Sequence, residues 1–199
     1  LADMFFSTNS GTCSTLSQNS NFTYTGIGLS LLRTRINTNG VSTWENSIMQ
    51  MAQTRGARVW STPWSPPPQF KSNGNVNGGT FLSASNQAYA NVLAQYVVNM
   101  QNSYGVNIYA LSVQNEPDLA TSYESCVWTG QQIHDFIPYL RSALNAAGKS
   151  SVKIIAAEDQ HWGTNLYAAA LSDPAVATNV NIIACHNYDN SPPSGIPAA

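Results

Sequence analysis

Five short apolar segments alternate along the chain with segments in which apolar residues recur at helical spacing. In the segment at residues 108–113 apolar and polar residues do not alternate cleanly, which is typical of a strand buried on both faces. We expect strands at residues 29–36, 57–60, 108–113, 153–157 and 181–185. The intervening helices are expected from Ser42 onward, at 86–102, at 129–147 and at 164–171.

Local signals place several element ends. Ser42 and Glu45 have the spacing of a capping box, and Gly148 follows the third of these helices, where glycine commonly ends a helix. A further short helix is expected at residues 2–6. Residues 69–85 are predicted to form a long polar loop, and loops of this length in a compact domain often carry function.

The strict alternation of strands and helices predicts an α/β fold with a parallel sheet and right-handed crossovers. No Gly-x-Gly-x-x-Gly or Walker-type loop follows any of the strands, which argues against a nucleotide-binding doubly wound domain. The alternation fits a (β/α)8 TIM barrel better, although five units cannot close one. We therefore expect residues 1–199 to form a single partial barrel domain.

Polar and aromatic residues collect where the predicted strands end. They are Trp60 and Trp64, Asn115 and Glu116, Glu158 and Trp162, and His186 and Tyr188. In a barrel these positions share the rim that carries the active site. Pro117 has no N–H and ends the central strand, so Glu116 is placed at its carboxyl end. Taken alone, a Glu-Pro at a strand end favours a carboxylate that faces solvent.

Composition narrows the choice of partner. Of the 199 residues only 9% are charged, against about 25% in typical soluble proteins. The net charge of −2 offers no electrostatic footprint for nucleic acid or an anionic membrane, and no apolar run approaches the roughly 18 residues that span a bilayer. A neutral polar surface with 10% aromatic residues suits hydroxyl-rich partners such as sugars. We expect no metal and no cofactor, because the three Cys and three His lack ligand spacing.

The N-terminal residues lack a basic region followed by an apolar core, so we expect a mature or internal segment rather than a signal peptide. Cys13, Cys126 and Cys185 permit at most one disulfide. Their pairing and the redox compartment stay open.

Four motifs in order resemble glycoside hydrolase family 30, and the stretch Tyr123-Glu124-Ser125-Cys126-Val127-Trp128 is most similar to its xylanase-type branch. The motifs are Leu31-Leu32-Arg33-Thr34-Arg35-Ile36, Trp60-Ser61-Thr62-Pro63-Trp64-Ser65-Pro66-Pro67, Ser112-Val113-Gln114-Asn115-Glu116-Pro117-Asp118 and Cys185-His186-Asn187-Tyr188. The resemblance implies a retaining β-glycosidase with a (β/α)8 barrel and a small β-sandwich. This chain would supply roughly strands two to six of the barrel, without the side β-sandwich.

The resemblance also implies roles for the strand-end residues. Glu116 matches the acid/base, whereas the nucleophile lies on strand seven of the family and is expected outside this chain. Retaining hydrolysis needs two carboxyl groups about 5 to 5.5 Å apart, so the segment alone is expected to be inactive. Glu158 is an alternative second carboxylate, although the resemblance places it on strand five.

The remaining matched residues are candidates for substrate binding. Asn115 fits a donor to the sugar 2-hydroxyl, and Arg33 fits an arginine that orients the nucleophile or forms a structural ion pair. His186 and Tyr188 could hydrogen-bond the sugar or the attacking carboxylate, and Trp60 and Trp64 could stack on sugars or pack in the core. Arg35, Trp128 and Trp162 are weaker candidates.

The leading interpretation is a secreted endo-acting enzyme on β-1,4-xylan or glucuronoxylan, monomeric at full length. One alternative is a β-1,6-glucanase or galactanase of the same family. Others are a non-catalytic carbohydrate-binding truncated barrel and an unrelated α/β binding module.

Overall fold

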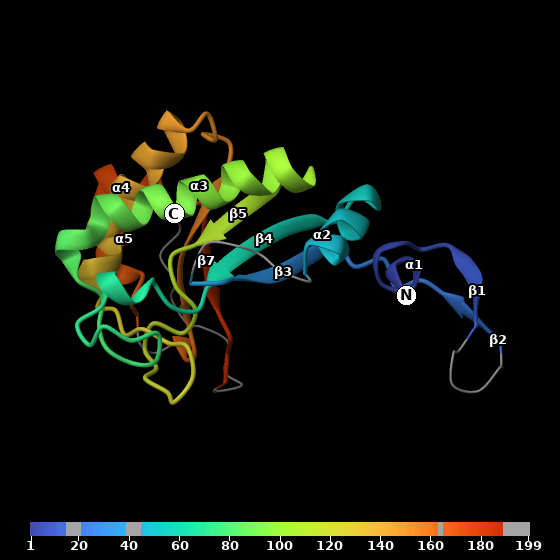
Figure 1. Ribbon diagram of the computed structural model, residues 1–199, viewed down its shortest axis with the longest axis horizontal. Helices are drawn as coiled ribbons and strands as arrows, with labels where there is room; N and C mark the ends of the chain where they lie inside the picture. The colour runs from blue at the N-terminus through green and yellow to red at the C-terminus, as the bar shows by residue number, and fades with distance from the viewer. Residues whose placement is uncertain (15–20, 39–44, 163–164, 189–199) are drawn as a thin grey trace.

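The structure, a computed structural model, describes residues 1–14, 21–38, 45–162 and 165–188. A five-stranded parallel sheet forms its centre, in the order β3-β4-β5-β6-β7 (Figure 1). The strands are β3 (Leu31–Ile36), β4 (Arg58–Pro63), β5 (Ile108–Ser112), β6 (Lys153–Asp159) and β7 (Ile182–Cys185). Spatial order follows chain order and every neighbouring pair is parallel, which confirms the predicted alternation of strands and helices.

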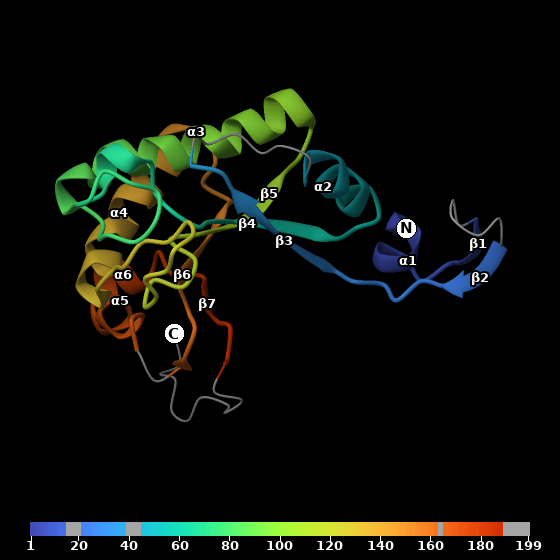
Figure 2. The same ribbon diagram turned by 60° about the horizontal axis from the view of Figure 1, so that its bottom comes forward.

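The helices are α2 (Glu45–Thr54), α3 (Asn86–Tyr104), α4 (Gly130–Ala146), α5 (Ala168–Ser172) and α6 (Pro174–Ala177). Figure 2 shows α3 to α6 gathered on one side of the curved sheet. Gly105 ends α3 in the left-handed conformation that glycine adopts without steric cost. Thr129 and Gln132 form a capping box at the start of α4. The capping box predicted at Ser42 lies outside the described residues.

The N-terminal region differs most from the prediction. The helix α1 (Ala2–Phe6) is present as expected, but it is followed by an antiparallel hairpin of β1 (Ser10–Ser14) and β2 (Asn21–Thr25). In Figure 1 this hairpin lies beyond α1, away from the main sheet. Its strands are rich in Ser, Thr and Asn, and the two alternating aromatic residues of β2, Phe22 and Tyr24, are too short a signal to have predicted a strand. The loop before α3 also contains two short 3₁₀ turns, η1 (Pro68–Phe70) and η2 (Ser83–Ser85).

The two faces of the sheet have different partners. Thr34 and Ser61 hydrogen-bond each other at 3.0 Å, and Ser61 also bonds Tyr96 of α3 at 2.9 Å, so these side chains lie on the face that the helices cover. Side chains alternate along a strand, so Arg33 and Thr62 point to the opposite face. That face is the inner side of the partial barrel, and it carries the polar site residues.

Aromatic packing closes the core between α3, α4 and the long loop. Trp128 stacks on Phe81 with ring centroids 3.9 Å apart and meets Phe136 edge-on at 5.4 Å. Only 2% of Trp128 is exposed. The suggestion that Trp128 lines a cleft is therefore wrong: it is a core residue that joins the 118–128 loop to the helices.

Among the described residues, no helix combines the length and apolar character needed to cross a bilayer. The same residues hold no cluster of three or more His, Cys, Asp or Glu side chains suited to a metal ion.

Replacing Trp128 with Ala should lower the free energy of unfolding of the full-length protein by about 3–5 kcal/mol, because it removes a stacked, fully packed ring. Denaturant unfolding measures this change. Tyr139→Ala, an exposed position on α4, is the matched control and should stay within about 0.5 kcal/mol of the wild type. A loss of less than 1 kcal/mol for Trp128→Ala would contradict this account of the core.

Candidate active site

The carboxyl ends of the strands bring one set of polar side chains together. Arg33 and Arg35 come from β3, Thr62 from β4, Asn115 and Glu116 from the turn after β5, Glu158 from β6, and His186 and Tyr188 from the turn after β7. This is the arrangement expected for the rim of a parallel barrel, where the loops after the strands face one side.

Backbone hydrogen bonds continue past the ends of the strands and fix these turns. The Asn115 N–H donates to the Pro63 carbonyl at 2.9 Å, and the Glu116 N–H donates to the Glu158 carbonyl at 3.0 Å. On the far side, the His186 N–H donates to the Asp159 carbonyl at 2.8 Å. The site is therefore carried by the sheet itself, with little freedom for its side chains to drift apart.

Glu116 is buried, with 7% of its surface exposed, and it faces the site. Its Oε1 lies 2.7 Å from His186 Nδ1 and accepts a hydrogen bond from the Tyr188 hydroxyl at 3.0 Å. The backbone takes a φ of 43° at Glu116, a conformation that residues with a Cβ seldom adopt. Pro117 blocks a helical continuation here, and the left-handed turn directs the carboxylate inward. The alternative of a solvent-facing Glu116 is wrong.

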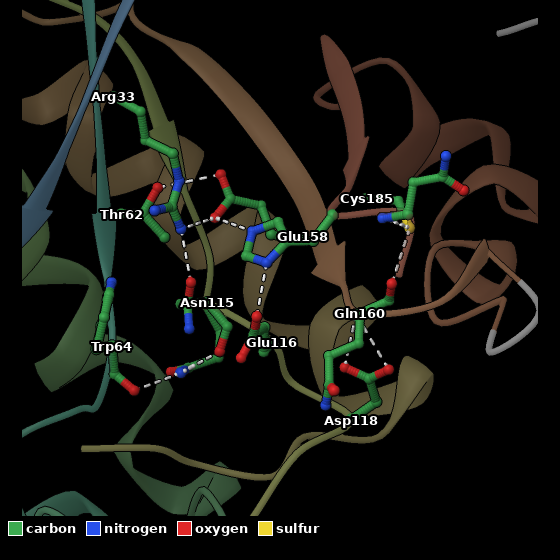
Figure 3. Close-up of polar contacts among 12 residues, drawn as sticks. Arg33, Thr62, Trp64, Asn115, Glu116, Asp118, Glu158, Gln160 and Cys185 are labelled. Carbon is green, nitrogen blue, oxygen red and sulfur yellow. Dashed lines mark hydrogen bonds and ion pairs between the residues drawn. The ribbon is translucent and has the colours of Figure 1, made fainter. Parts of the chain in front are cut away.

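Arg33 connects the turn after β5 to the end of β6 (Figure 3). Its guanidinium donates to Asn115 Oδ1 at 2.6 Å and to Glu158 Oε2 at 2.8 Å. Because the oxygen of the Asn115 amide is engaged, its Nδ2 group is left as the donor. This orientation is the one that donation to a sugar hydroxyl requires.

Glu158 lies between these groups with 1% of its surface exposed. Its Oε1 accepts a hydrogen bond from Thr62 at 3.1 Å, and its Oε2 pairs with Arg33 and lies 4.0 Å from His186 Nε2. A nucleophile must reach the anomeric carbon of the sugar with a free oxygen. The burial of Glu158 and its two engaged oxygens do not fit that role.

Aromatic side chains and one ion pair form the rim beside β3 and β4. The Arg35 guanidinium sits 4.9 Å above the Trp64 ring, and Arg35 also pairs with Glu124. The rings of Trp64 and Tyr123 are 6.1 Å apart, and Tyr123 is 49% exposed. Exposed aromatic faces of this kind can stack on sugar rings.

Trp60 has a different place from Trp64. It is the register partner of Arg33 and lies two residues before Thr62, so it points to the inner face below the rim. Among the described residues, the hydrogen-bond partners of Glu116 Oε1 are His186 and Tyr188, and Trp60 is not one of them.

A buried lysine fastens the loops that carry this rim. Lys71 Nζ donates to Ser65 Oγ at 2.8 Å, to the Val76 carbonyl at 2.8 Å and to the Ser125 carbonyl at 2.6 Å. Burial lowers the pKa of Lys71. The 65–81 loop and the 118–128 loop are thereby held as one wall of the site.

The sequence profile of the Glycosyl hydrolase family 30 TIM-barrel domain matches residues 33–195. The chain belongs to glycosyl hydrolase family 30. Membership confirms the predicted fold class, a partial (β/α)8 barrel, and the predicted family.

Two family 30 proteins are similar over most of the chain. Glucuronoxylanase XynC of Bacillus subtilis (strain 168) is 35% identical over 168 residues, which cover 81% of this chain and 37% of that enzyme. The subfamily 8 xylanase Xyn30A from Clostridium acetobutylicum has a TM-score of 0.74 at 38% identity, over 83% of this chain and 44% of that chain. The chain thus spans less than half the length of either protein.

An endo-1,6-beta-D-glucanase of Neurospora crassa is also similar, with 35% identity over 97 residues, which cover 44% of this chain and 20% of the relative.

Most of the residues that this site brings together are predicted from the sequence, whereas Thr62, Gln114 and Tyr123 are not. Gln114 Nε2 donates to the Trp64 carbonyl at 2.7 Å and thereby ties the turn after β5 to the one after β4. Thr62 could have been found, since it lies two residues after Trp60 and so shares its face of the strand.

The pKa of Tyr188 depends on Glu116 even when no substrate is bound. Its hydrogen bond to Glu116, together with the negative charge of that carboxylate, raises the pKa of the Tyr188 hydroxyl. Glu116→Gln should therefore lower the pKa of Tyr188 towards about 10, because a neutral amide disfavours the phenolate less. Ultraviolet difference titration measures the change, and the Tyr188→Phe variant identifies which part of the signal is Tyr188. An unchanged Tyr188 titration in Glu116→Gln would show that the two groups are not in contact.

Proposed function

We propose that the protein containing this chain is a retaining endo-β-1,4-xylanase that acts on glucuronoxylan, with Glu116 as its general acid/base. The carrying observation is the asymmetric carboxyl group of Glu116. Both of its hydrogen bonds with described residues fall on Oε1. In the tautomer of His186 that carries a proton on Nδ1, Oε1 accepts from both partners, and Oε2 is then the oxygen that holds the proton. The similarity to XynC and Xyn30A supports xylan as the substrate.

The first step of this mechanism uses Glu116 as an acid. Its Oε2 proton passes to the glycosidic oxygen as the C–O bond breaks, while a second carboxylate attacks the anomeric carbon from the other face. The donors at Oε1, His186 and Tyr188, stabilise the negative charge that Glu116 acquires. Asn115 Nδ2 donates to the sugar 2-hydroxyl, an interaction that strengthens in the transition state.

In the second step the Glu116 carboxylate takes a proton from water, and the oxygen of that water attacks the anomeric carbon and displaces the enzyme carboxylate. The nucleophile is proposed to lie outside these 199 residues, about 5 to 5.5 Å from Glu116. We propose that the 199 residues form a single partial barrel domain and that this domain alone has little or no activity.

The rim residues supply the binding surface for the chain of sugars. Trp64 and Tyr123 offer adjacent aromatic faces, and Trp60 lies deeper on the inner face. A polymeric substrate cannot enter a cell, so the enzyme is proposed to be secreted. The full-length protein is proposed to act as a monomer.

A second candidate is hydrolysis of β-1,6-glucan, which the similarity to the Neurospora crassa endo-1,6-beta-D-glucanase favours. Assays of the full-length protein on glucuronoxylan, arabinoxylan, β-1,6-glucan and β-1,6-galactan separate the two. Turnover of a β-1,6-linked polymer in preference to either xylan would replace the xylanase proposal. Binding without hydrolysis of any of them would indicate a carbohydrate-binding protein.

Glu116→Gln in the full-length protein should lower kcat/KM on glucuronoxylan by about 10²- to 10⁴-fold, because it removes the proton donor. The matched control is Asp135→Asn on the outer helix α4, which should keep wild-type activity.

Glu116→Ala should retain turnover of an aryl xyloside with a good leaving group, since that bond needs no proton. Added azide should then accelerate this variant and yield the β-glycosyl azide. An α-glycosyl azide, or no response to azide, would assign Glu116 a different role.

A further inference from the structure

We propose that Glu158 is the positioning residue of this active site: its carboxylate fixes Arg33 and faces His186, and through these two side chains it orients Asn115 and Glu116. The inference deepens the proposed function and rests on it. Three independent features of the structure carry it.

The first feature is a break in the pleat of β6. Ile154 and Ala156 pack into the core on the helix-covered side of the sheet, so regular alternation would put Glu158 on that side as well. The register to β7 shifts between Ala156 and Glu158, and Ala157 takes a φ of 54°. This bulge turns Glu158 to the inner face, where it meets Arg33.

A left-handed backbone is costly for alanine, and bulges that re-aim a side chain are frequent beside active sites. Ala157 is fully buried, so neither solvent nor a loop end accounts for its conformation. The chain thus adopts a strained conformation at the one position that brings Glu158 into the site.

The second feature is the set of groups that Glu158 contacts. Arg33 joins Glu158 Oε2 to Asn115 Oδ1 through a single nitrogen, Nη2, at 2.8 and 2.6 Å. Movement of the Glu158 carboxylate would therefore move the guanidinium and release the amide. Thr62 holds the other oxygen of Glu158 at 3.1 Å, which leaves the carboxylate one well-defined position.

The third feature is the placement of charge around His186. Its Nδ1 faces Glu116 at 2.7 Å, with Tyr188 on the same carboxylate oxygen, and its Nε2 faces Glu158 at 4.0 Å, with Arg33 on that side. Glu158 and Arg33 thus border the imidazole on the side opposite Glu116. Displacement of Glu158 would therefore disturb the contact between His186 and Glu116 as well as that between Arg33 and Asn115.

The test uses the full-length protein with Glu158→Gln. We expect kcat on glucuronoxylan to fall by about 10²-fold with a much smaller change in KM, because misplacement of Asn115 and Glu116 affects the transition state more than substrate binding. The NMR resonance of the Asn115 side-chain amide should also shift, because the amide oxygen is released from Arg33. Glu158→Asp retains the carboxylate and should show a smaller loss of kcat and a smaller shift of this resonance.

Ser61→Ala is the matched control for lost stability. It removes two buried hydrogen bonds on the opposite face of β4 and should lower the melting temperature without moving the Asn115 side-chain amide resonance. Thr62→Val is a second variant, useful if Glu158→Gln does not fold. It frees one oxygen of Glu158 and should reduce kcat in the same direction by a smaller factor.

The outcomes separate this inference from the proposed function. If the wild type hydrolyses xylan and Glu158→Gln, or Thr62→Val in its place, matches it in kcat and in the Asn115 resonance, the positioning role is overturned and the xylanase proposal stands. If the wild type hydrolyses no xylan, the proposed function fails. The Asn115 side-chain amide resonance then decides the positioning role: a shift in Glu158→Gln supports it, and an unchanged resonance overturns it.

Discussion

The parallel alignment of five strand ends is the constraint on which the site depends. Each strand contributes one or two polar side chains. Those from different strands, such as Arg33 and Tyr188, are far apart in the sequence and would not meet without the sheet. The hydrogen bonds beyond the strands, from Asn115 to Pro63 and from Glu116 to Glu158, extend this alignment into the turns. The backbone therefore fixes the positions from which the side chains of the site extend.

The cost of this arrangement is the burial of charge. Glu116 and Glu158 are buried, and an unpaired charge there would be strongly destabilising. Each is compensated by a partner from another strand, so the network satisfies itself only when all the strands are in register. A polar network of this kind favours one packing of the barrel wall over its alternatives.

Much of the fold and of the site could be predicted from sequence, for identifiable reasons. Continuous apolar runs and helical spacing are local signals, so the five strands and the main helices were predicted with ends displaced by a few residues. The strand-end rule then placed Glu116, Asn115, His186 and Tyr188 together. The rule failed for Trp128, because a Trp in a loop reads the same whether it faces a cleft or stacks on Phe81 in the core.

What could not be predicted depends on contacts between distant segments. The hairpin of β1 and β2 has only Phe22 and Tyr24 on an apolar face, and the bulge at Ala157 is invisible in a continuous apolar run. The central place of Glu158 follows from that bulge, so sequence alone assigned it only to a rim. The pairing of Trp64 with Tyr123 likewise needs two loops to meet.

The fastening of those loops has a consequence for the working range of the protein. Lys71 is the shared anchor of both loops, and in its protonated form its ammonium group supplies all three donors. Since burial lowers the pKa of this amine, it becomes neutral at a less alkaline pH than a lysine on the surface would. A neutral amine has only two N–H groups for three acceptors. In strongly basic solution the wall formed by these loops thus loses part of its tether, so the arrangement of Trp64 and Tyr123 has an alkaline limit set by Lys71.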